Sequence, residues 1–83
     1  MSTPTLTLYS RPGCHLCDEA RAALERVRAR TTFSLHEVNI ESDDSLLRRY
    51  LERIPVVALG EEELFEFFVD EAALEAKLYR LPG

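Results

Sequence analysis

Cysteine is scarce in this sequence, with two residues among 83. Small secreted scaffolds usually need several disulfides, so two cysteines exclude a fold held together mainly by disulfides. The start MSTPTLTLYS has neither a basic segment nor a long apolar one, so no signal peptide is expected. No apolar run approaches the roughly 18 residues that a membrane span requires. These absences predict a cytoplasmic protein, in which a close cysteine pair serves redox chemistry or metal binding.

Basic residues are also few, with ten against fifteen acidic ones and a net charge of −5. The imbalance is largest in residues 61–83, which contain two basic and seven acidic residues. Such a chain is a poor partner for nucleic acid or an anionic membrane, so neither is expected. A hydrophobic content of 46% excludes a disordered chain, and the short length leaves room for one small core. Residues 1–83 are therefore predicted to form a single domain.

Glycine and proline are rare and separate the predicted elements. The alternation and helical spacing of the apolar residues predict the order βαβαββα. Strands are expected at Thr5–Tyr9, Phe33–Ile40, Val56–Leu59 and Glu63–Val69, and helices from Cys14, from Ser42-Asp43-Asp44, and over Asp70–Arg80 with Pro82-Gly83 as the stop. The predicted fold class is α/β, with a four-stranded mixed sheet and three helices packed on it.

The connections predict the directions of the strands. Helices join the first three strands, which implies that these are parallel neighbours. The turn at Gly60-Glu61-Glu62 implies that the last two strands form an antiparallel hairpin. Leu6 and Leu8 share one face of the first strand, and three phenylalanines near the end of the last strand are expected in the core: Phe65, Phe67 and Phe68.

The motif Cys14-His15-Leu16-Cys17 lies where the loop after the first strand leads into a helix. The first turn of a helix has unpaired N–H groups and the positive end of the dipole, and both stabilise a thiolate. Cys14 is therefore predicted to be the exposed nucleophile. Cys17 lies on the apolar face of the helix with Ala20 and Leu24, and it is predicted to be the buried resolving thiol, which attacks the mixed disulfide.

Nearby charges act on Cys14 in both directions. Arg11 and His15 are cationic candidates for lowering the pKa of the thiol, whereas Asp18 and Glu19 oppose them. The balance predicts a pKa that is moderately rather than extremely lowered.

Other uses of the two cysteines stay open on spacing alone. A zinc site usually needs four ligands, and only His15 and His36 could add nitrogen, so no metal site within the chain is expected. A metal ion or iron–sulfur cluster shared across a dimer would use the same cysteines. A redox-inert interaction module would keep only the fold. A structural disulfide that closes so short a loop stabilises a protein little.

The chain resembles the glutaredoxin-like branch of the thioredoxin superfamily. The resemblance lies in Leu6-Thr7-Leu8-Tyr9-Ser10-Arg11-Pro12-Gly13-Cys14-His15-Leu16-Cys17, in Ile54-Pro55-Val56-Val57, and in the hairpin and the helix opened by Asp70. It is similar to small bacterial glutaredoxin-like proteins with a Cys-x-Leu-Cys motif. The resemblance implies the thioredoxin/glutaredoxin fold and a thiol–disulfide oxidoreductase, with Cys14 as nucleophile and Cys17 as resolving thiol.

The same resemblance implies a role for the Ile54-Pro55 pair. By themselves these residues indicate only a proline that opens a strand. In the family the matching proline is cis and faces the cysteines, and the residue before it offers backbone hydrogen bonds to the incoming peptide or glutathione. We therefore expect Pro55 to be cis and Ile54 to contact substrate. Arg11 and His15, beside Cys14, are the other candidate substrate-binding residues.

Two departures from the family argue against glutathione recognition. His15-Leu16 stands where glutathione-using glutaredoxins have Pro-Tyr, and Phe67-Phe68-Val69-Asp70 stands where a Gly-Gly pair lets the backbone approach glutathione. The expected substrate is a protein or low-molecular-weight disulfide, and the expected reductant is glutathione or a thioredoxin-reductase-like protein. No tightly bound cofactor is expected, with glutathione a candidate co-substrate, and the chain is predicted to be a monomer.

The predicted role of Cys14 can be tested by titration. In a Cys17→Ser variant, thiolate absorbance reports Cys14 alone, and we expect a pKa below the ordinary thiol value of about 8.5 because helix-terminal N–H groups stabilise the thiolate. An unperturbed value near 8.5 would contradict the prediction.

Overall fold

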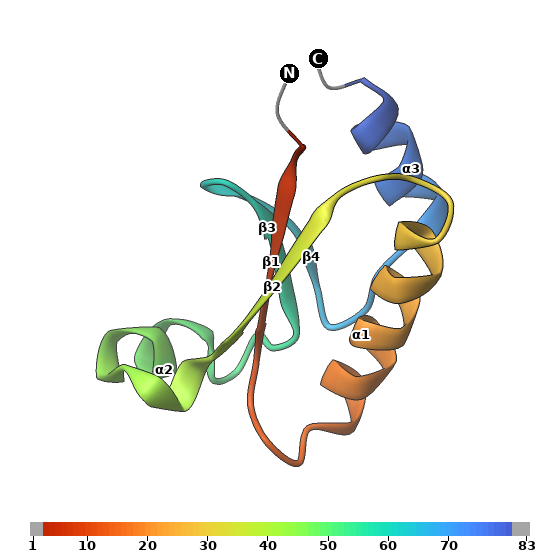
Figure 1. The fold of residues 1–83 in the computed structure, drawn as a ribbon. Helices are drawn as coiled ribbons and strands as arrows, with labels where there is room; N and C mark the ends of the chain where they lie inside the picture. Colours follow the sequence, from red (N-terminus) through yellow and green to blue (C-terminus); the bar gives the residue numbers. More distant parts are fainter. Residues whose placement is uncertain (1–2, 81–83) are drawn as a thin grey trace.

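The computed structural model describes residues 3–80. Four strands form one sheet in the order β2-β1-β3-β4, and three α-helices pack against it (Figure 1). The strands are β1 (Thr5–Ser10), β2 (Ser34–Asn39), β3 (Val56–Leu59) and β4 (Glu62–Glu66). The helices are α1 (His15–Arg28), α2 (Asp44–Tyr50) and α3 (Glu71–Tyr79), with a short 3-10 turn η1 (Ile40–Ser42) before α2. The α/β class and the mixed four-stranded sheet are confirmed, and the predicted stop at Pro82-Gly83 lies outside the described residues.

The direction of β3 corrects the sequence-based prediction. β1 and β2 are parallel, but β1 and β3 are antiparallel, with Leu6 opposite Leu59 and Tyr9 opposite Val56. The reason is the length of the connection, because seven-residue α2 is about 10 Å long and six-residue β2 spans about 20 Å. Instead of returning along the sheet, α2 lies beside the end where β2 finishes (Figure 1). β3 therefore begins at that end and runs the opposite way.

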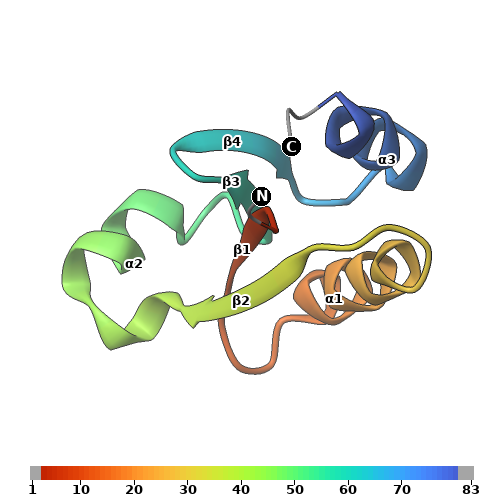
Figure 2. The ribbon, with the colours of Figure 1, turned by 45° about the horizontal axis from the view of Figure 1, so that its top comes forward.

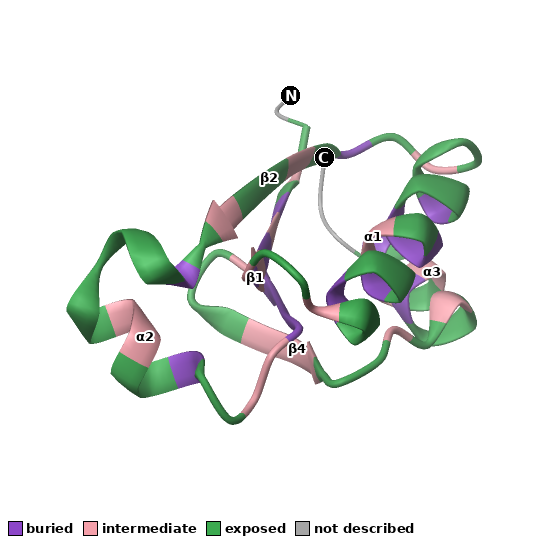
Figure 3. Cartoon of the chain, turned by 90° about the horizontal axis from the view of Figure 1, so that it is seen from below, coloured by how far each residue is buried: buried purple, intermediate pink, exposed green. Residues whose placement is uncertain are grey.

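One face of the sheet carries the larger core. α1 and α3 lie side by side on this face, and α2 lies on the other (Figure 2). The buried residues of α1 form a stripe along its inner side, as the helical spacing predicted (Figure 3). Leu6 and Leu8 of β1 are fully buried against this stripe, together with Leu24 of α1 and Leu74 of α3. The predicted apolar face of β1 is therefore confirmed.

Two acidic residues start the later helices. Asp43 caps α2, where its carboxylate accepts the backbone N–H of Ser45 at 2.7 Å, and Asp70 caps α3 by accepting the N–H of Ala73 at 3.1 Å. Each cap satisfies N–H groups that have no partner within the helix. Both start positions follow the sequence-based prediction.

Tyr50 anchors α2 to the second face of the sheet. Its ring stacks on Tyr9 of β1 with centroids 4.4 Å apart, and the guanidinium of Arg53 lies 5.3 Å from its centroid. Its hydroxyl donates to Glu63 of β4 at 3.1 Å, and Arg53 donates to the same carboxylate. These contacts couple α2 to β1 and β4, although α2 has few buried residues (Figure 3).

The end of β4 differs from the prediction. The strand ends at Glu66 rather than at Val69, because Phe67 has a φ of +70°, a left-handed conformation that breaks the extended backbone. Its N–H donates to the carbonyl of Pro55 at 2.8 Å. Phe65 packs against the larger core, but Phe67 and Phe68 are exposed, and their assignment to the core is wrong.

No helix in the described part of the chain is long and apolar enough to cross a membrane.

The Glu63 contacts predict a pH-dependent contribution to stability. Hydrogen bonds from Arg53, and then from Tyr50, hold the pKa of Glu63 below its ordinary value against the opposing effect of burial. A lowered folded-state pKa means that the stabilisation is complete above the unfolded pKa of about 4.3 and is lost as the pH falls through the folded value. We expect Glu63→Gln to lower the free energy of unfolding at pH 7 by up to about 1 kcal/mol, because the ion pair is partly solvent-exposed.

Urea unfolding between pH 7 and pH 3 checks this. The difference between wild type and variant should shrink as the pH falls from the unfolded-state pKa of about 4.3 toward the lowered folded-state pKa of Glu63. Glu61→Gln, in the exposed turn before β4, is the matched control and should have little effect. If the difference in unfolding free energy between wild type and Glu63→Gln stays constant with pH, the stabilisation does not come from the charge of Glu63.

Candidate active site

The turn Arg11-Pro12-Gly13-Cys14 carries the chain from β1 to α1. The N–H of Cys14 donates to the carbonyl of Arg11 at 3.4 Å, and Gly13 has a φ of +78°. Proline at the second position and a positive-φ glycine at the third are the signature of a type II turn. The local sequence therefore encodes the reversal that places Cys14 at the start of the helix.

Cys14 is the N-cap of α1, and Cys17 lies in the first turn of that helix. The two form a disulfide, with Cα atoms 5.1 Å apart, which is within the usual range for a bridged pair. Cys14 is partly exposed and Cys17 is fully buried, so the two differ in access as expected. A reagent from solvent therefore reaches Cys14 more easily than Cys17.

A backbone N–H group faces the sulfur of Cys14. The N–H of Cys17 points at Cys14 Sγ at 3.1 Å, which is the geometry of a helix cap made by a sulfur atom. In the reduced state the same N–H, together with the helix dipole, would stabilise a thiolate at this position.

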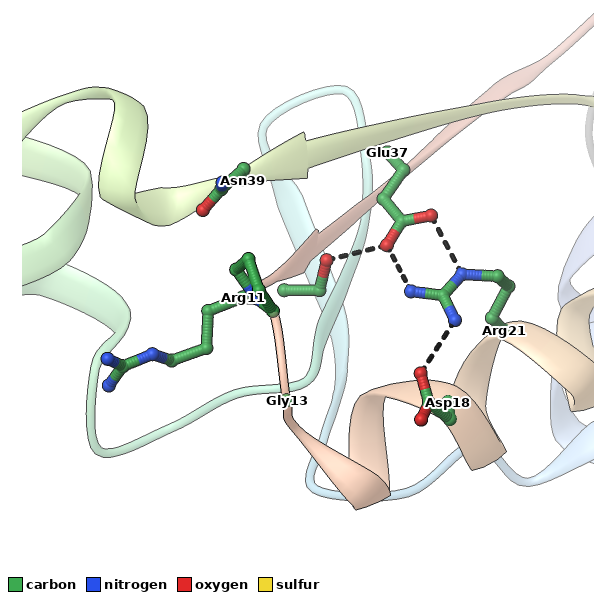
Figure 4. A pocket seen from close by; sticks show the side chains of 8 residues that line it. Arg11, Gly13, Asp18, Arg21, Glu37 and Asn39 are labelled. Atoms are coloured by element: carbon green, nitrogen blue, oxygen red, sulfur yellow. Dashed lines mark hydrogen bonds and ion pairs between the residues drawn. The ribbon is translucent and has the colours of Figure 1, made fainter.

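The charged neighbours of Cys14 are already paired. The guanidinium of Arg11 lies 2.7 Å from the carboxylate of Glu41 and extends toward α2, away from α1 (Figure 4). His15 is largely exposed, and its Nε2 lies 3.3 Å from Glu19 one turn along the helix. Arg11 and His15, which the sequence offered as substrate contacts, thus have carboxylate partners here, and their role in binding stays a prediction.

A polar network lies behind the turn and was not found from the sequence. The buried hydroxyl of Ser10, the last residue of β1, donates to Glu37 of β2 at 2.7 Å (Figure 4). Arg21 of α1 donates to Glu37 through Nε at 2.8 Å and to Asp18 at 2.8 Å. Arg21, and to a smaller extent Ser10, hold the pKa of Glu37 below its ordinary value although burial opposes this. The network ties β1, β2 and α1 together where the turn begins.

Only tertiary structure pairs these residues, because Ser10 and Glu37 lie 27 positions apart. The available signal was a polar residue at the end of a buried strand, which usually needs a partner.

Ile54 and Pro55 lie at the same end of the sheet as the cysteine turn. Val56 pairs with Tyr9, so Pro55 is next to the end of β1 in the antiparallel register. The Ile54–Pro55 peptide bond is cis, which confirms the expectation drawn from the resemblance. Pro55 is buried and accepts the N–H of Phe67, so the segment after β4 is held at this end too.

Metal ligands do not gather in the described residues. Within residues 3–80, no group of three or more histidine, cysteine, aspartate or glutamate side chains is arranged to hold a metal ion.

The central mixed sheet, the helices on its two faces and the CxxC pair at the start of α1 define a thioredoxin-like α/β protein. Residues 5–79 match the family model of the glutaredoxin-like domain (DUF836). The chain therefore belongs to the glutaredoxin-like family of the thioredoxin superfamily, as the sequence resemblance predicted.

Solved structures agree with this assignment. The chain is 36% identical to protein Ne2328 from Nitrosomonas europaea, with a TM-score of 0.80 over 94% of each chain. It is 35% identical to protein XcR50 from X. campestris, with a TM-score of 0.75 over 93% of this chain and 99% of that one. A thioredoxin from Halobacterium salinarum shares the fold at 18% identity, with a TM-score of 0.63 over 93% of this chain and 73% of that one.

The left-handed backbone at Phe67 can be tested by two substitutions at one position. We expect Phe67→Gly to be more stable than Phe67→Ala by about 0.5–1 kcal/mol, because glycine adopts a positive φ without the steric penalty of Cβ. Both variants lose the ring, so their difference in unfolding free energy isolates the backbone.

The adjacent residue is the matched control. Phe68 has no positive φ, so there the alanine variant should be the more stable of the two. Equal stabilities of Phe67→Gly and Phe67→Ala in chemical denaturation would contradict the strained conformation.

Proposed function

We propose that this protein is a thiol–disulfide oxidoreductase that cycles between a Cys14/Cys17 dithiol and the Cys14–Cys17 disulfide. The observation that carries the proposal is the difference between the two cysteines. The accessible Cys14 caps a helix and receives an N–H at its sulfur, whereas Cys17 is fully buried within disulfide reach. This asymmetry suits an attacking and a resolving thiol.

The reaction begins with the reduced protein. The Cys14 thiolate attacks one sulfur of the substrate disulfide, which forms a mixed disulfide and releases the other substrate sulfur as a thiolate that takes a proton from solvent. Cys17 then loses its proton to solvent and attacks Cys14 Sγ, which releases the second substrate thiolate. The substrate gains two electrons and two protons, and the protein loses them and is left with the Cys14–Cys17 disulfide until it is reduced again.

A thiol reductant must return the two electrons. We propose glutathione or a thioredoxin-reductase-like protein for this step, and a reducing compartment such as the cytoplasm as the place where the cycle runs. The substrate is a protein or low-molecular-weight disulfide that contacts the surface around Cys14 and the backbone of Ile54 and Pro55. The cycle needs no metal and no bound cofactor, and one chain carries both cysteines.

Cysteine variants test the cycle. We expect Cys14→Ser to lose the disulfide-reducing activity, because no other described sulfur is accessible, whereas Cys17→Ser should react once and stop as a mixed disulfide. Insulin reduction measures the rate, and mass spectrometry detects the trapped adduct.

Circular dichroism of both variants serves as the folding control. Undiminished insulin reduction by Cys14→Ser would contradict the proposal. Protein purified without oxygen should also lack the visible absorbance of an iron–sulfur cluster, and a stoichiometric cluster held by these cysteines would contradict the redox cycle as well.

A further inference from the structure

Three large apolar side chains are exposed around one hollow beside the cysteine pair. Leu16 is 46% exposed, Phe67 is 48% exposed and Phe68 is 70% exposed. All three line the same hollow, whose other apolar lining comes from Ala20, Ala23 and Val69. Single exposed apolar residues are ordinary, but a group around one concavity marks an interaction site. We call this the Leu16–Phe67–Phe68 hollow.

The hollow adjoins the redox motif through Leu16. Leu16 lies between the two cysteines, and Ala20 and Ala23 follow on the same helix. On the opposite side, Phe67 is held by its N–H bond to Pro55 at the end of the sheet that carries the cysteine turn. The segment after β4 passes near the first turns of α1 in Figure 1. A polypeptide whose disulfide reaches Cys14 therefore has neighbouring residues beside this hollow.

The backbone conformation at Phe67 is independent support for a binding site at this hollow. A phenylalanine in the left-handed region is unusual, because its Cβ lies too close to the following carbonyl oxygen. Such strain persists where the surrounding structure holds it, and it is concentrated at binding and active sites. Here the conformation ends β4 and leaves two aromatic rings partly in solvent rather than in the core.

Charge at the hollow disfavours a ligand with carboxylates. The only cation among its lining residues is Arg26, and its guanidinium already binds Glu71 of α3 at 2.9 and 3.0 Å. The other charged lining residue is Glu19, which is acidic and faces His15. Glutathione, with two carboxylates, finds no unpaired positive charge among these residues, whereas an apolar side chain needs none.

The size of the hollow fits one side chain. Its volume is about 170 Å³. The hollow is smaller than the roughly 300–1,000 Å³ of pockets that enclose a whole small-molecule ligand, and it suits one side chain rather than a whole peptide.

We propose that the Leu16–Phe67–Phe68 hollow binds a large apolar side chain next to the reacting cysteine of a polypeptide substrate. The inference rests on the proposed function and names its substrate class. The protein then reduces disulfides with apolar flanking residues in preference to glutathione disulfide. Binding energy from the flanking side chain holds the substrate sulfur near Cys14.

Two matched peptides test the preference. Each carries one cysteine as a mixed disulfide with thionitrobenzoate, one with phenylalanine beside the cysteine and one with serine. Single-turnover release of thionitrobenzoate by the reduced protein gives the two rates, and dithiothreitol corrects for intrinsic reactivity. We expect wild type to prefer the phenylalanine peptide about tenfold, and Phe68→Ser to reduce this preference to about twofold or less.

Tyr79→Ser is the matched control, because Tyr79 is also an exposed aromatic residue, at 79%, but lies at the end of α3 and does not line the hollow. Its preference should equal that of wild type. Equal rates for both peptides in wild type, or an undiminished preference in Phe68→Ser, would overturn the inference while leaving the redox cycle intact. If the proposed redox cycle itself is wrong, the result is different: Cys14→Ser releases thionitrobenzoate as fast as wild type.

Analytical ultracentrifugation tests whether a second copy of the chain occupies the hollow instead of a substrate. Wild type should sediment as a monomer at the concentrations of the assay. A dimer that Phe68→Ser dissociates would mean that a second copy of the chain covers the hollow, and the substrate inference would be overturned.

Discussion

β1 is hydrogen-bonded along both edges and packed on both faces, and the position of the cysteine pair depends on this placement. β2 and β3 flank it in the sheet. Leu6 and Leu8 lie in the core beneath α1 and α3, and Tyr9 stacks on Tyr50 on the side of α2. Ser10, at its end, is bonded to β2. A strand restrained from four sides gives the turn that follows it a rigid starting point, as a reactive group on a loop requires.

From that starting point, the chemistry at Cys14 depends on backbone groups more than on side-chain charges. The nearby basic residues Arg11 and His15 each face a carboxylate, which offsets the positive charge that they could place near the sulfur. The N–H of Cys17 and the start of α1 remain as thiolate-stabilising groups.

The start of β3 lies next to the end of β1 in the antiparallel pairing, beside the cysteine turn, and it carries the second half of the candidate site. Pro55 is buried there and bonds to Phe67, so the segment after β4 is positioned by the same register that places β3 beside β1. The fold thus brings the motif between the cysteines and the aromatic pair after β4 to one surface.

Local features were predictable from the sequence because they depend on neighbours along the chain. The Pro-Gly turn, the caps at Asp43 and Asp70, the burial of Cys17 and the α/β class all follow from residue preferences and helical spacing. Three features depended on contacts between distant segments. The short α2 turned β3 antiparallel, Ser10 found its partner on β2, and the left-handed backbone at Phe67 exposed two rings that had been assigned to the core as apolar residues. Composition and spacing describe how a segment prefers to fold, but the direction of a strand and the exposure of its last residues are decided by the elements that it meets.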